Sequence, residues 1–490
     1  MNILIVGNGF DLSHYLPTKY DHFMDVMKAV ESKETGKKIA DLSIHTVGEW
    51  MRLLEQMFEK RKGLEQPNYD MDFNELFSCV RDKWFIEKTE ELYLTEQIKI
   101  SSQDVLKLQY RLELNDWYQY FKNHVREVKT WIDFEIKISE ALRVVANFLI
   151  QLENIMDEFG SFSTKICFYG QREQRQIFLT REYCNVLELF KILKSGYFVD
   201  QEDYDENGCS FDIPVDIGDS VEGDLRFYIN HTYILFQSGF SKIKIDQILS
   251  GLYEQLDDFI EIFNQYLELV VNQLNPLENL KISCNDWIYP DKIYSFNYTN
   301  TYRRFYDVTE VDYLHGSHGE RQNIVLGISD LEYDNLKKLK AYGFTKYHQR
   351  LFNDTDYLFL DGYKNTISNT KKEIMNLENQ LKGENRSAYR DAVRNKIDKI
   401  DQQNKLNLNF YIWGHSLDIS DRDYIFDLFS LNDEMDRNVK VTVYYFDKNA
   451  KFYLLSNLLA ILKKDKVEHW MKNGWLKFEP NPNVVETNNT

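Results

Sequence analysis

The feature that most constrains this chain is the position of its strand-like segments, which lie near the two ends of the sequence with a long helical stretch between them. A run of branched aliphatic residues at 2–6 ends in a glycine-containing turn, and similar runs return only after residue 290. Short buried strands separated by helical segments are typical of a parallel sheet with crossover helices. The sequence therefore predicts an α/β fold whose sheet is discontinuous along the chain. The further strands are predicted at 292–296, 311–314, 323–326, 408–413 and 439–446.

The sheet is predicted to form a Rossmann-like, nucleotide-binding core, because many nucleotide-binding α/β domains begin with a buried strand that runs into a glycine turn. This core is assigned to residues 1–20, 285–330 and 405–490. Residues 21–284 are predicted to form a large α-helical insert domain, and residues 331–404 a second helical excursion.

The helical predictions rest on spacing. Between Ile245 and Val270 apolar residues recur at intervals of three and four, which gives one continuous helix face. Thr18 is expected to cap a helix that follows the first turn. The section near 371–405 is rich in Lys, Glu and Asn and is predicted to be a solvated helical hairpin. A looser stretch at 194–225 combines glycines with many acids and is predicted to be a long surface loop.

Composition excludes several classes of protein. The 490 residues carry 59 Lys and Arg against 78 Asp and Glu, a net charge of −19, which argues against a general nucleic-acid binder. Five Cys without a Cys-x-x-Cys pair indicate a reducing compartment with mostly buried thiols. The first residues lack a basic leader, and no window offers the ~18 consecutive apolar residues of a membrane span. We therefore expect a cytoplasmic protein that does not enter the membrane.

Four polar clusters follow four of the predicted strands. In open parallel sheets, ligands bind beyond the carboxyl ends of the strands. These clusters are therefore expected to converge on one site. They lie at Gly7–Asp11, Asn297–Asn300, His315–Ser317 and Gly414–Asp418.

The same segments carry a family resemblance. The motifs at 8–12, 16–20, 295–299, 315–316 and 414–417 resemble, in the same order, those of the bacterial abortive-infection AbiH family. Trp131-x-Asp133-x-Glu135 is similar to an internal acidic motif of that family. The resemblance implies an effector of phage defence that acts by abortive infection.

A more distant resemblance is to the sirtuin-like NAD-consuming domains. It implies that Asn297 and His315 are catalytic, with His315 as the general base, and that a ribose lies against Ser416. It further implies NAD as the substrate, cleaved at the bond between nicotinamide and ribose, with no cofactor or metal required. The four-cysteine zinc module of the sirtuins is absent from the chain, which argues against protein deacylation. The implied nucleotide-binding residues are Gly7, Asn8, Gly9, Phe10, Asp11, Gly316, Gly414 and Ser416.

The residue types suit this chemistry. Cleavage of a glycosidic bond passes through an oxocarbenium-like state, and a histidine of near-neutral pKa can accept a proton from water or a ribose hydroxyl. The amide of Asn297 can hold that water or the ribose hydroxyls without adding charge. Gly7 and Gly9 would let backbone N–H groups approach a phosphate, and Asp11 suits a ribose or the cationic nicotinamide ring.

Each residue also has a structural interpretation. His315 can cap a strand, and Asp11 can bond to its own turn. His415 is expected to be a packed neighbour of Ser416, and the Trp131 motif a buried structural network. Metal ligation by His315-x-x-His318 and by Asp418-x-x-Asp421-x-Asp423 is a further alternative, although Ser420-Asp421 also fits a helix N-cap.

Three functions therefore remain open. The first is an NAD glycohydrolase that acts as the toxic arm of phage defence. The second is a metal-dependent nuclease or nucleotide hydrolase in the same role. The third is a nucleotide-binding sensor without turnover. The expected partners are NAD or a related nucleotide, a phage or host protein that triggers the response through the insert, and a second copy of the chain in a homo-oligomer.

Overall fold

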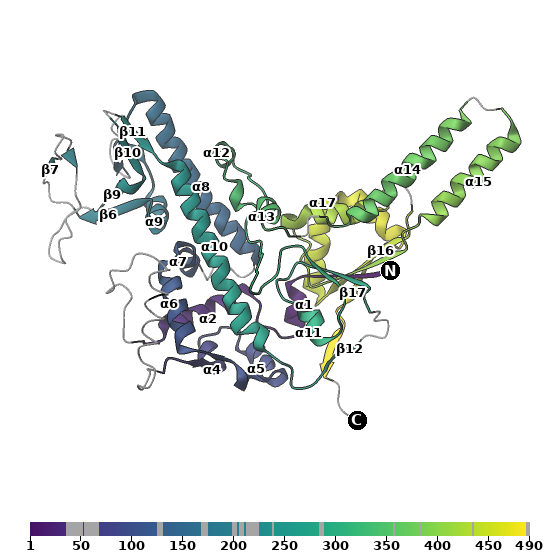
Figure 1. The fold of residues 1–490 in the computed structure, drawn as a ribbon, viewed down its shortest axis with the longest axis horizontal. Helices are drawn as coiled ribbons and strands as arrows, with labels where there is room; N and C mark the ends of the chain where they lie inside the picture. Colours follow the sequence, from purple (N-terminus) through teal and green to yellow (C-terminus); the bar gives the residue numbers. More distant parts are fainter. Residues whose placement is uncertain are drawn as a thin grey trace.

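Six short segments pair into one parallel sheet in the computed structural model, which has a mixed α/β architecture (Figure 1). Every neighbouring pair of strands in this sheet is parallel. The strands, in spatial order, are β14 (Val311–Tyr313), β13 (Lys292–Ser295), β1 (Asn2–Val6), β15 (Leu408–Trp413), β16 (Val439–Tyr445) and β17 (Leu476–Pro480). The residues described by the structure are 1–35, 52, 68–124, 131–167, 175–197, 203–204, 210–211, 225–237, 240–283, 289–355, 358–382, 385–433 and 436–486.

Strand β1 lies in the middle of the sheet, so the two ends of the chain meet there. Ile5 is in register with Tyr294 of β13 on one side and with Ile412 of β15 on the other. The prediction that residues 2–6 share a parallel sheet with residues 408–413 is therefore confirmed. The sequence did not predict β17, which completes one edge.

Alternate residues of β1 enter different cores, as the pleat of a strand requires. Ile3 and Ile5 pack into a cluster with α16 (Arg422–Ser430) and α17 (Lys448–Lys472). Leu4 and Val6 pack on the opposite face with Phe10 of α1 (Asn8–Ser13) and Tyr302 of α11 (Thr301–Phe305). Both faces of the sheet are therefore covered.

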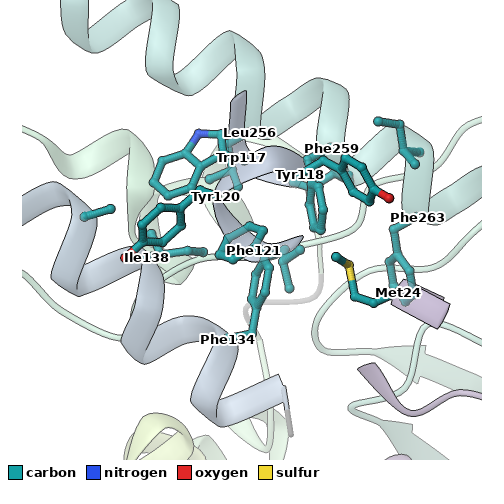
Figure 2. Close-up of a cluster of buried hydrophobic side chains, with 14 of the residues drawn as sticks. Met24, Trp117, Tyr118, Tyr120, Phe121, Phe134, Ile138, Leu256, Phe259 and Phe263 are labelled. Carbon is teal, nitrogen blue, oxygen red and sulfur yellow. The ribbon is translucent and has the colours of Figure 1, made fainter. Parts of the chain in front are cut away.

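Between β1 and β13 the chain forms a large, mostly helical body with an aromatic core, which we call the helical body. Figure 2 shows part of this core, in which rings from α7, α8 and α10 interlock. Phe121 and Phe134 have ring centroids 4.2 Å apart, and Phe134 stacks on Phe259 at 5.4 Å. The helices are α2 (Tyr20–Ser32), α4 (Phe73–Leu76), α5 (Lys83–Leu92), α6 (Ser102–Leu114), α7 (Asp116–His124), α8 (Trp131–Phe159), α9 (Arg181–Leu189) and α10 (Ile245–Leu269).

This body is not wholly helical, so the prediction of a helical domain over 21–284 overlooked its short strands. Its strands have two to five residues, too few for a period of two to be recognised in the sequence. One four-stranded sheet has the order β5 (Ile177–Phe178), β4 (Lys165–Cys167), β9 (Leu225–Ile229), β6 (Leu193–Tyr197). The two-stranded sheets are β2 (Met71–Asp72) with β3 (Lys99–Ile100), β7 (Asp203–Tyr204) with β8 (Ser210–Phe211), β10 (Ile234–Gln237) with β11 (Phe240–Ile243), and β12 (Leu280–Ser283) with β18 (Asn483–Glu486).

The strand predicted at 323–326 does not form. Ile324, Val325 and Leu326 are buried as expected, but their backbone joins no ladder. Val325 N–H donates to the carbonyl of His315, and Leu326 N–H to the side chain of Gln349. An apolar run was mistaken for a strand because burial alone does not distinguish a strand from a packed loop. Most of the loop predicted at 194–225 lies outside the described residues.

The predicted helical hairpin is confirmed and begins earlier than expected. Helices α14 (Asp361–Leu381) and α15 (Ser387–Gln403) project from the sheet side of the molecule (Figure 1). Ile374, Leu377, Val393 and Ile400 form a small core of its own. The other helices of the 331–404 excursion are α12 (Asp334–Lys338) and α13 (Lys346–Phe352).

Two further predictions can be compared with the described residues. Cys184 is buried, as expected for most thiols, but Cys79 is exposed. No helix in the described part of the chain has the length and apolarity needed to cross a membrane.

The turns after β1 and β15 touch through glycine. Gly414 has φ +74°, and a Cβ there would lie 2.0 Å from the backbone nitrogen of Phe10.

We expect Gly414→Ala to destabilise the protein by about 2–4 kcal/mol, because the left-handed backbone and the steric clash both oppose a side chain. Urea unfolding measures this change. Gly251→Ala is the matched control: Gly251 lies in α10 with open space around it, and alanine there should stabilise the helix by up to about 1 kcal/mol. Equal effects of the two substitutions would contradict the packing described.

Candidate functional site

A cavity of about 300 Å³ lies at the carboxyl ends of the central strands. All four polar clusters contribute to its lining, and the helical body closes it from the other side. Seven predicted site residues line it, namely Gly7, Asn8, Asp11, Asn297, His315, Gly414 and Ser416. Gly9, Phe10 and Gly316 are not part of the lining.

The three predicted residues outside the lining have structural roles. A Cβ on Gly9 would lie 2.7 Å from Gly414 Cα, and one on Gly316, which has φ +77°, would lie 1.9 Å from the carbonyl oxygen of Asn323. Phe10 is buried with its ring edge-on to Trp413. These residues hold the turns together and lie behind the cavity.

The backbone amides of the first turn are already engaged. Gly7 N–H donates to the carbonyl of Trp413, Gly9 N–H to that of Gly414, and Phe10 N–H to that of Gly7. The expectation that the glycine amides approach a phosphate is therefore not supported by this geometry. The glycines instead allow the turns after β1 and β15 to approach each other closely.

Thr18 does not cap the helix that follows it. Helix α2 begins at Tyr20 after Lys19, whose side chain makes no capping bond. The Thr18 hydroxyl instead donates to Asn8 Oδ1 at 2.7 Å, and the carbonyl of Thr18 accepts from Trp131 Nε1 at 3.2 Å. Thr18 thus holds the side chain of Asn8 in place at the cavity and also joins this segment to helix α8.

Asp11 and Asn297 carry buried polar atoms that lack partners. Asp11 Oδ2 accepts from the Thr299 hydroxyl at 2.6 Å, but its Oδ1 has no partner among the described residues. The amide oxygen and nitrogen of Asn297, which is 5% exposed, make no well-aligned hydrogen bond there, although the amide acts to lower the pKa of Asp11. Burial raises the pKa of Asp11 to about 6, although the bond from Thr299 acts in the opposite direction. Buried polar atoms are nearly always satisfied in folded proteins, so these atoms are suited to bind a polar ligand.

His315 is buried and neutral. Burial lowers the pKa of His315 to about 4, against the opposing effect of Asp421. Its Nε2 lies 3.2 Å from Asp421 Oδ1, without the alignment of a hydrogen bond. His315 is therefore a weaker base than the histidine of near-neutral pKa expected from the sequence, and the carboxylate beside it stabilises the imidazolium that forms when it accepts a proton.

Asp421 is the centre of a buried charge network. Its Oδ2 lies 3.3 Å from Nε2 of His415, and its Oδ1 lies 3.4 Å from the Lys346 ammonium. Burial alone would raise the pKa of Asp421, but Lys346 and His315 hold it well below its usual range. The Leu417 N–H donates to His415 Nδ1, so both ring nitrogens of His415 face protein groups. This agrees with the expectation that His415 is a packed neighbour.

Two charged residues that sequence analysis did not assign to the site, Lys346 and Glu135, line the cavity. Lys346 Nζ lies 2.6 Å from Glu135 Oε1, and both side chains are almost fully buried. Burial raises the pKa of Glu135 to about 7, with Lys346 acting to lower it. The Trp131 motif did draw attention to Glu135, but as a structural residue. No sequence signal distinguishes Lys346, because it lies in a charged helical stretch among many lysines.

The side of the cavity opposite the sheet has an aromatic wall. Trp131 and Phe263, both from the helical body, have ring centroids 4.6 Å apart, and Tyr298 packs edge-on to Phe263 at 5.5 Å. The cavity therefore combines buried polar groups on the sheet side with aromatic rings on the helical side.

The acidic residues proposed as metal ligands do not converge. Asp418 accepts from Ser420 N–H and so caps the 3₁₀ turn Ile419–Asp421, whereas Asp423 is exposed beside Arg422. His318 bonds to Glu268 and lies outside the lining. Within the described residues, no three His, Cys, Asp or Glu side chains gather as a metal-binding set.

Fold and cavity together define an α/β protein with a polar site at the carboxyl edge of its parallel sheet. A family described as "Bacteriophage abortive infection AbiH" matches residues 3–445, so the chain belongs to the AbiH family. This membership indicates a role in abortive infection of phage-infected bacteria. No curated protein and no solved structure matches the chain significantly.

The buried carboxyl group of Asp11 makes stability depend on pH. Because its pKa in the folded state, about 6, exceeds its ordinary value of 3.8, the native state binds the proton more tightly and loses stability as pH rises from about 4 to about 6. We expect Asp11→Asn, which retains an acceptor for Thr299, to stabilise the protein at pH 7.5 by up to about 3 kcal/mol and to have little effect near pH 4. Urea unfolding at both pH values measures this, with the exposed Asp423→Asn as control. A variant that is less stable than the parent at pH 7.5 would show that Asp11 is not a strained site residue.

Proposed function

We propose that this AbiH protein is a phage-defence effector that hydrolyses NAD at the bond between nicotinamide and ribose, in the cavity at the carboxyl edge of its sheet. The observation that carries the proposal is the meeting of three groups in one cavity: the partly unpartnered carboxyl of Asp11, the unpartnered amide of Asn297 and the neutral imidazole of His315. A cavity near 300 Å³ is at the lower end of the range usual for small-molecule sites.

We further propose that the sheet is a Rossmann-like, sirtuin-like core. Numbered along the chain, its six strands have the spatial order 3-2-1-4-5-6, which is the order of doubly wound dinucleotide-binding sheets. In such sheets the ligand lies where the strand order reverses. Here that place is between β1 and β15, and Gly7 and Gly414 from these two strand ends line the cavity. The segment between β1 and β13 would then be the insert domain.

Each group has a role in the proposed hydrolysis. The bond from the ribose carbon to the nicotinamide nitrogen breaks with its electron pair moving to the ring, which leaves an oxocarbenium-like ribose. Asp11, which is mostly ionised above pH 6, would stabilise that charge electrostatically while neutral nicotinamide leaves. Asn297 would orient a water molecule whose oxygen bonds to the ribose carbon. His315 would take a proton from that water as the carbon–oxygen bond forms, with Asp421 stabilising the imidazolium.

The aromatic wall supports a substrate that carries planar rings. Trp131, Phe263 and Tyr298 offer ring faces and edges within the same lining as Asp11 and His315. Stacked and edge-on aromatic contacts add to the burial of a planar base. NAD itself is the proposed substrate, with no cofactor or metal required. The cytoplasmic location, the trigger protein and the homo-oligomer stay predictions.

The test is to incubate the purified full chain with NAD in the presence of EDTA and to measure nicotinamide and ADP-ribose. We expect turnover by the parent and a loss of roughly 10²–10⁴-fold in His315→Ala, the range usual when a general base is removed. Asn297→Ala should also lose most of its activity. The matched control is His231→Ala, because His231 is exposed and lies in the helical body away from the cavity.

Each outcome separates the candidate functions. Turnover by His315→Ala at the parent rate would overturn the catalytic assignment. Turnover that appears only without EDTA would favour metal-dependent chemistry, and NAD binding by calorimetry without product would favour a nucleotide-binding sensor.

A further inference from the structure

We infer that Glu135, contributed by helix α8 of the helical body, is a positioning residue of the site that acts through Lys346 on Asp421 and thereby on His315. The inference rests on the proposed function, in which His315 accepts the proton, and it assigns a role to the part of the chain that lies outside the sheet.

A continuous line of contacts supports it. Glu135 Oε1 lies 2.6 Å from Lys346 Nζ, which lies 3.4 Å from Asp421 Oδ1, and that same oxygen lies 3.2 Å from Nε2 of His315. Four separate segments supply these groups: α8, the start of α13, the 3₁₀ turn Ile419–Asp421 and the loop after β14. The side chains of Glu135, Lys346 and Asp421 are at most 12% exposed, so solvent screens their charges poorly.

Lys346 is placed between two carboxylates and lies closer to Glu135. Asp421 Oδ1 is therefore shared: it accepts from Lys346 at 3.4 Å and faces His315 at 3.2 Å, while Oδ2 faces His415. If Glu135 lost its charge, the ammonium would move toward Asp421, because that would be the remaining carboxylate beside it. Lys346 would then compete with His315 for the same oxygen atom.

The other charged and titratable groups around these side chains do not replace Glu135. Asp421, Lys346, Arg350 and Tyr424 surround His315, and Asp421 is the one anion among them. Glu135 is influenced by Lys346, Asp421 and Asp418, of which Asp418 is occupied as a cap. Above pH 7, where it is mostly ionised, Glu135 is therefore the second anion that balances Lys346.

The experiment compares Glu135→Gln, Glu135→Asp and Glu140→Gln in the full chain. Gln retains the shape of Glu and removes its charge, whereas Asp retains the charge. Glu140 is the matched control, since it lies on the same helix in a half-exposed pair with Lys137. The rate of NAD cleavage is measured from pH 5 to pH 9, and thermal unfolding confirms that each variant is folded.

For Glu135→Gln we expect kcat at pH 8.5 to fall about tenfold or more, because a small misplacement of a catalytic group can cost up to about 100-fold in rate. KM should change little. The deficit should be largest near pH 8.5 and should shrink below pH 7, because Glu135 of the parent then takes up a proton and loses its charge as well. Glu135→Asp should recover part of the rate. A loss of packing would instead lower the rate by the same factor at every pH.

A second readout does not depend on NAD. We expect the ¹⁵N imidazole signals of His315 and His415 to shift in Glu135→Gln but not in Glu140→Gln. If the parent fails to cleave NAD, the proposed function fails, and these signals still decide the inference. Unchanged histidine signals, or a parent-like kcat and pH profile in Glu135→Gln, would overturn it.

Discussion

The structure depends on the central position of β1. A strand of five residues at the start of the chain pairs on one side with β13 and on the other with β15, so segments almost 300 and more than 400 residues away must return to it. Buried on both faces, its backbone amides and carbonyls find partners only in those strands. The helical body and the α14–α15 hairpin are therefore excursions from one sheet.

Closing the sheet around β1 brings the turns after β1 and β15 into contact. Gly9 and Gly414 permit this approach, because a Cβ on either would collide with the other turn. The same contact places Asp11 and His415 at one edge of the sheet. Side chains from the turns after β13 and β14, Asn297 and His315, complete this edge. The glycines of the first turn thus contribute to the site by allowing the turns after β1 and β15 to pack closely.

Burying charge at this edge is costly unless the charges are paired. The site contains two solutions to this requirement. Asp421 is held ionised by Lys346 and the histidines, whereas Asp11 pairs with no cation among the described residues and its pKa rises toward neutrality. Such divergence between neighbouring carboxyl groups is frequent where acid and base roles are divided. Glu135 and Lys346 extend the network into the helical body, so the site is shared between the sheet and the excursions.

The sequence by itself determined the parallel sheet, its discontinuity and four of the loops that line the cavity. These features follow from local patterns: branched aliphatic runs, glycines and polar residues at strand ends. It could not determine that Gly9 packs against Gly414 or that Thr18 bonds to Asn8, because both contacts depend on how two segments meet. Only the tertiary structure decided that Lys346 and Glu135 belong to the site. One charged side chain among many acquires its role from the distance to its partner and from exclusion of water, and neither is encoded within a short stretch of sequence.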